Sequence, residues 1–132
     1  MRDLAAPSAA DIDALARMAF ADMPEAFRAR CPDLVIRVEE LADDDTLDEL
    51  DIDDPFELTG LFDGVALTER SVDDVAPAPN VVTLYRRAIL DEWAERGDVA
   101  LGALVAHVLA HEIGHHFGLS DDDIRAIDDW TA

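Results

Sequence analysis

The stretch from Val99 to Leu119 constrains the fold of this chain more than any other segment. Its side chains are apolar or absent except at His107, His111, Glu112, His115 and His116. A helix that is apolar on nearly all sides is buried. Burying a carboxylate and several imidazoles costs free energy unless they find partners, and a divalent cation is the strongest partner available. The segment therefore predicts a buried, metal-binding helix.

The spacing of the polar residues indicates how a metal would be held. His111 and His115 are four residues apart, so on a helix their side chains lie one above the other. Both imidazoles can then bind one zinc ion at about 2.0–2.1 Å. Glu112 lies about 100° around the helix from His111, so it borders the metal without being a ligand. From there a carboxylate can take a proton from zinc-activated water, which makes Glu112 the predicted catalytic base.

A third ligand is expected where this helix ends, because catalytic zinc sites use three protein ligands and one open position. Gly118 can adopt the left-handed conformation that ends a helix and turns the chain back, which brings Asp121 toward the ion. Asp122 and Asp123 are neighbouring alternatives. Asp123 fits better as the capping-box partner of Ser120, so Asp121 is the predicted third ligand.

The complete pattern from His111 to Asp121 is HExxHxxGxxD. It resembles the metzincin signature, in which a third ligand follows the glycine by three residues. One departure is visible, since no methionine follows Asp121 and the Met-turn of the larger metzincins has no counterpart. We expect other residues to form the floor below the metal.

The wider sequence is similar to the small bacterial zincin-like metallopeptidases. The similarity covers Leu58 through Ile127 and includes Leu61–Val65, Leu84–Arg87 and His111–Asp123. It implies that His111, His115 and Asp121 bind Zn²⁺ and that Glu112 is the catalytic base. It also implies an α+β fold, in which a small mixed sheet packs on the buried active-site helix and further helices flank it.

Local patterns predict the other elements. Apolar spacing and end signals predict helices over 8–27 with Ser8 as N-cap, over 86–96 before Gly97, from Asp98 to Phe117, and a short one after Ser120. Branched residues predict strands at 34–38 and 81–85, and Asp63-Gly64 is typical of a hairpin turn between 58–62 and 65–68. The acidic stretch 43–54 has room for a short helix. It does not have the central glycine and the terminal glutamate at the offsets that a calcium-binding EF-hand loop requires.

Composition limits the setting and the partners. A chain of 132 residues fits one domain, so we expect residues 1–132 to form a single domain. A net charge of −21 disfavours nucleic acids and anionic membranes and favours basic peptide or protein substrates. Cys31 is the single cysteine, and no signal segment is recognisable, so a cytoplasmic location is expected.

The predicted function is zinc-dependent hydrolysis, with a peptide bond as the leading substrate. If the strand at 81–85 lies at a sheet edge, a peptide can bind by adding a strand to it. Tyr85 is a candidate oxyanion donor, although packing at the strand end is the preferred interpretation. Hydrolysis of a non-peptide amide and a non-catalytic, metal-stabilised binding module are the alternatives. A further alternative is that His111, Glu112 and His115 are core residues satisfied by hydrogen bonds.

Overall fold

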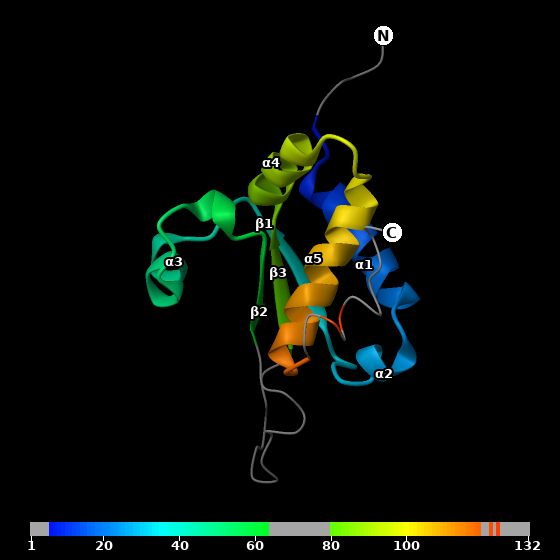
Figure 1. The fold of residues 1–132 in the computed structure, drawn as a ribbon. Helices are drawn as coiled ribbons and strands as arrows, with labels where there is room; N and C mark the ends of the chain where they lie inside the picture. The colour runs from blue at the N-terminus through cyan, green and yellow to red at the C-terminus, as the bar shows by residue number, and fades with distance from the viewer. Residues whose placement is uncertain (1–5, 64–79, 120–121, 123, 125–132) are drawn as a thin grey trace.

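The computed structural model describes residues 6–63, 80–119, 122 and 124. Within them the fold is α+β, with a three-stranded mixed sheet and helices packed against it (Figure 1). The predicted fold class is confirmed. The second strand of the predicted hairpin at 65–68 and most of the predicted helix after Ser120 lie outside the described residues.

Helix α1 (Ala9–Asp22) begins as its sequence predicts. The Ser8 hydroxyl accepts from the Asp11 N–H at 3.1 Å, and the Asp11 carboxylate accepts from the Ser8 N–H at 2.8 Å. These two bonds form a capping box, which satisfies backbone donors that the first helical turn leaves without partners.

The predicted end of this helix, at residue 27, is wrong. Met23 precedes Pro24 and is extended, with φ −69° and ψ 154°, because the proline ring disfavours a helical conformation in the residue before it. The chain therefore leaves α1 at Asp22 and makes a separate short helix, α2 (Glu25–Arg28).

The sheet has the strand order β1-β3-β2. Strand β1 (Val35–Glu39) is parallel to β3 (Val81–Tyr85), and β2 (Gly60–Asp63) is antiparallel to β3. The bounds of β3 are those predicted, and β1 is shifted by one residue. Strand β3 lies between two neighbours, so the condition for adding a peptide to it, a position at the sheet edge, is not met. Among the described residues, β2 is the edge strand beside the last helix.

Two helices follow β3. Helix α4 (Arg86–Arg96) has its predicted bounds and ends at Gly97, whose φ of 78° is left-handed. Helix α5 (Leu101–His116) begins later than predicted: Ala100, rather than Asp98, is the N-cap residue, and its side chain makes no capping bond. Packing of α5 against α1 and the sheet, rather than capping, therefore determines where it begins.

Helix α5 lies across one side of the sheet with α1 beside it (Figure 1). Its apolar face is fully buried at Leu104, Val105, Leu109 and Ile113, and it shares one core with α1 and the strands. No helix among the described residues is long and apolar enough to cross a membrane.

The acidic segment, residues 43–57, packs apart from the main core. Helix α3 (Asp44–Leu50) begins at Asp43, whose carboxylate accepts from the Thr46 N–H at 2.8 Å, and a 3-10 turn, η1 (Pro55–Glu57), follows. A second small core forms between this segment and the start of α4, from Ala42, Leu47, Tyr85 and Ala88. The expectation of a short helix in 43–54 is confirmed.

Candidate metal centre

The two predicted histidine ligands lie together near the end of α5. The ring centres of His111 and His115 are 5.5 Å apart, and the rings are inclined at 80°. Two imidazoles that share a tetrahedral zinc at Zn–N distances of about 2.0–2.1 Å place their ring centres about 5 Å apart. The separation of the two rings is therefore compatible with a shared zinc ion.

None of the polar side chains of α5 is fully buried, contrary to the sequence prediction. His115 is exposed, and His111 and Glu112 are partly exposed. The apolar side chains of the helix take up the contacts with the core, so its histidine face is left open to solvent. A catalytic zinc requires such access, because substrate and water must reach its open coordination position.

The end of α5 has the predicted geometry. Gly118 has a φ of 78°, its N–H donates to the His115 carbonyl at 3.0 Å, and the Leu119 N–H donates to the Gly114 carbonyl at 2.9 Å. This pair of bonds is a Schellman motif, which ends a helix at a left-handed residue. The chain therefore turns back at Gly118, as the sequence predicts.

The predicted third ligand, Asp121, lies outside the described residues, as do Ser120 and Asp123. Across the part of the chain that the structure describes, no three His, Cys, Asp or Glu side chains form a metal-binding group. The rival candidate Asp122 is exposed and does not complete such a group with the two histidines. Asp121 thus stays a prediction, while its described neighbour in sequence, Ile124, is fully buried against α5.

Glu112 points toward β2 rather than into open solvent. Its carboxylate accepts a hydrogen bond from the Phe62 backbone N–H, and its Cγ lies 3.2 Å from the position that a Cβ on Gly60 would take. Partial burial raises the pKa of Glu112 to about 7, although the His115 charge and the Phe62 amide both oppose the rise. A divalent cation beside the carboxylate would oppose it further.

The family model described as Zincin-like metallopeptidase matches residues 31–131, which are well over half of the chain. The chain belongs to this family. No curated protein matches it.

The remaining histidines of this zincin-like chain have other contacts. His107 lies with its ring centre 4.2 Å from that of His111 at 52°, closer than two ligands of one tetrahedral zinc, and it is only partly buried. It is thus a ring neighbour of the predicted ligand rather than a fully buried core residue. His116 stacks on Phe62 with ring centres 4.1 Å apart and 24° between planes, so its ring packs against β2.

Tyr85 packs in the second core and is 3% exposed. Burial, together with the nearby carboxylates of Glu39, Asp43 and Glu112, raises the pKa of its hydroxyl. A side chain so little exposed is poorly placed to meet a substrate. The packing interpretation is therefore favoured over an oxyanion donor.

The zincin-like fold brings two further residues to the site that sequence reasoning missed. Gly60 carried a signal, because an isolated glycine in a strand pattern often marks a close approach of another segment. Phe62 acts through its backbone N–H, which every residue except proline carries, so no residue type could have revealed it.

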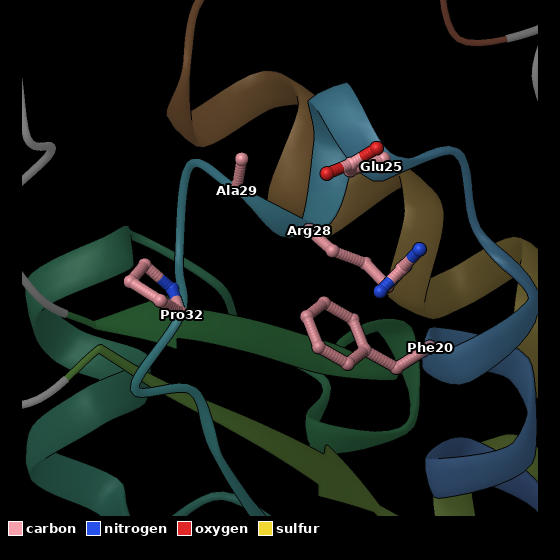
Figure 2. Close-up of a pocket in the computed structure, with 5 residues that line it drawn as sticks. All are labelled: Phe20, Glu25, Arg28, Ala29 and Pro32. Atoms are coloured by element: carbon pink, nitrogen blue, oxygen red, sulfur yellow. The ribbon is translucent and has the colours of Figure 1, made fainter.

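One surface hollow lies away from these residues. It has a volume of about 290 Å³ and is lined by Phe20, Glu25, Arg28, Ala29 and Pro32 (Figure 2). The Arg28 side chain extends toward the Phe20 ring, and its Nε donates to the Met23 carbonyl at 2.9 Å. This bond between α2 and the end of α1 stabilises the junction that Pro24 creates. None of the lining residues belongs to the predicted site.

Proposed function

We propose that this chain is a zinc-dependent peptidase in which His111, His115 and Asp121 hold the metal and Glu112 is the catalytic base. The observation that carries the proposal is the 5.5 Å separation of the two imidazoles beside a partly buried carboxylate on the next position of the helix. Membership of the zincin-like metallopeptidase family supports it.

The chemistry divides between the metal and the protein. When bound, zinc polarises a substrate carbonyl and makes water a stronger nucleophile. The Glu112 carboxylate accepts the proton of the attacking water and donates it to the amine nitrogen of the leaving group. Its position one residue after His111, and its partial exposure, support this role for Glu112.

The proposed substrate is an extended peptide that runs along β2. The Tyr85 N–H donates to the Thr59 carbonyl at 2.9 Å, and the antiparallel register pairs Leu61 with Thr83. Because hydrogen-bonded pairs alternate in such a ladder, the backbone groups of residues 60 and 62 face away from β3. That outer edge lies beside α5. Because its Phe62 N–H is bonded to Glu112, a peptide that adds a strand there would meet the other outward-facing backbone groups of residues 60 and 62. The net charge of −21 favours basic peptides.

A digest of a peptide library tests this function, with metal analysis of each protein. Wild type is expected to contain zinc and to cleave. Glu112→Gln is expected to keep its zinc and to lose about 10²–10⁴-fold in rate, the usual contribution of a general base. Loss of zinc in a His111→Ala variant is the matched metal control. Full cleavage by Glu112→Gln, or zinc without any cleavage by wild type, would contradict the proposal; the second result favours a metal-stabilised binding module.

A further inference from the structure

We propose that strand β2 is the positioning element of the catalytic base: Gly60 leaves room for the Glu112 side chain, and the Phe62 amide holds its carboxylate. Gly60 and Phe62 are positioning residues, because they act through Glu112. The catalytic meaning of this arrangement depends on the function proposed above, whereas the contacts themselves do not.

The first observation is how one face of α5 meets β2. Val108, Glu112 and His116 are spaced by four residues, so they lie along one stripe of the helix. Strand β2 touches all three. A Cβ on Gly60 would lie 3.0 Å from Val108 Cγ1 and 3.2 Å from Glu112 Cγ, and the Phe62 ring stacks on His116 at 4.1 Å. The strand therefore contacts α5 one turn before and one turn after Glu112, as well as at Glu112 itself.

The second observation is the direction of the Phe62 amide. Residues 59 and 61 pair with β3, so the N–H of Phe62 points to the outer edge of β2, where the Glu112 carboxylate accepts it. Phe117 packs edge-on against Phe62, with ring centres 5.9 Å apart, and the Arg30 guanidinium lies 5.8 Å from the centre of the Phe117 ring. These contacts stabilise the strand in the position from which the amide donates.

The physical need for such an element follows from the glutamate side chain. Helix α5 determines the position of the Glu112 backbone, but three rotatable bonds separate that backbone from the carboxylate. A catalytic group must be held to within about 0.5 Å of its productive position by its surroundings. At Glu112 the surroundings on one side are β2, whose glycine and amide provide the room and the donor.

The first test compares two alanine substitutions. Gly60→Ala forces a shift of Glu112 or Val108, while Gly102→Ala adds a Cβ at an ordinary 3.4 Å from Leu15 Cδ2, away from the site. The contacts at 3.0 and 3.2 Å require Val108 or Glu112 to give by a few tenths of an ångström. Since misplacement of a reacting group by about 1 Å can cost about 10²-fold, we expect Gly60→Ala to lower kcat by less than that, about 3–10-fold, with little change in KM or zinc content. Gly102→Ala should match wild type. Equal kcat values for the two variants would overturn the proposal.

The second test removes the Phe62 donor alone and does not require Gly60→Ala to fold. Replacing residue 62 by the α-hydroxy analogue of phenylalanine turns its amide into an ester and keeps the side chain. The matched control is the same change at Leu61, whose N–H serves the ladder with β3. The ester at 62 should lower kcat with zinc content unchanged, and the ester at 61 should lower only stability. Equal losses of kcat for the two esters would mean that the hydrogen bond from Phe62 to Glu112 only stabilises the fold, and would overturn the positioning role.

A measurement without turnover separates this inference from the proposed function. In the amide NMR spectrum of the full chain, Glu112→Ala should move the Phe62 N–H resonance upfield, because a carboxylate acceptor is lost, and leave the Leu61 resonance in place. An unmoved Phe62 resonance would overturn the positioning role whatever the activity. The expected shift in a protein that cleaves no peptide would overturn the peptidase proposal and leave the Phe62 contact standing.

Discussion

Gly114 is the position on α5 where a single methyl group is expected to have the largest effect. A Cβ there would lie 2.6 Å from Cγ1 and 2.7 Å from Cδ1 of Ile124, which is fully buried. Overpacking of a core costs about 1–3 kcal/mol. The higher helix propensity of alanine offsets up to about 1 kcal/mol of that cost. Gly114→Ala should therefore lower the free energy of unfolding by up to about 2 kcal/mol, although alanine is the better helix former.

The matched control is again Gly102→Ala, where the added methyl meets Leu15 at an ordinary distance of 3.4 Å. This variant should be as stable as wild type or more stable, by up to about 1 kcal/mol. Urea unfolding of wild type and both variants measures the difference, and the slope of the transition should not change. Because Ile124 lies three residues beyond Asp121, Gly114→Ala should also weaken zinc binding, and Gly102→Ala should not.

The reasoning is refuted if the two alanine variants are equally stable. That result would mean that Ile124 does not rest on Gly114. A double-mutant cycle with Ile124→Val gives a second measurement, because removing the Cδ1 atom relieves one of the two short contacts. The cycle should show a favourable coupling between Gly114→Ala and Ile124→Val, since residues in contact are not additive.

Three further predictions concern other parts of the chain. Asp51 ends α3 with a left-handed φ of 58°, a conformation that glycine adopts without strain. Asp51→Gly should therefore raise the free energy of unfolding, measured by urea titration, by about 0.5–1 kcal/mol. Asp51→Ala should give no such gain, because alanine is still strained in this conformation. Burial raises the pKa of the Cys31 thiol to about 11, so this thiol ionises in the unfolded chain at a lower pH than in the folded protein. The free energy of unfolding should therefore fall as the pH rises above about 8.5. Unfolding curves at pH 8 and pH 10 should show a smaller fall in this free energy for Cys31→Ala than for wild type. Asp121→Ala should weaken zinc binding in a chelator competition, whereas Asp122→Ala should leave it unchanged, and the reverse order would make Asp122 the third ligand.

The elements that the sequence predicted well are those with local causes. Strand β3 and helix α4 have their predicted bounds, because branched residues favour a strand and Gly97 offers the left-handed conformation that ends a helix. The early end of α1 also has a local cause, in Pro24, which the apolar periodicity outweighed in the prediction. The central place of β3 has no local cause, since the neighbours of a strand depend on contacts between distant segments.

The candidate metal centre also combines features with local causes and features that depend on contacts between distant segments. The pairing of His111 with His115 and the turn at Gly118 follow from helical periodicity and from the freedom of glycine, both properties of the chain itself. The environment of Glu112 does not follow from them. Its partial burial and its bond to the Phe62 amide exist because folding brings a strand some fifty residues earlier in the chain against α5. Local patterns can name the reacting group, but the carboxylate's position and pKa depend on neighbours that meet it only in the folded protein.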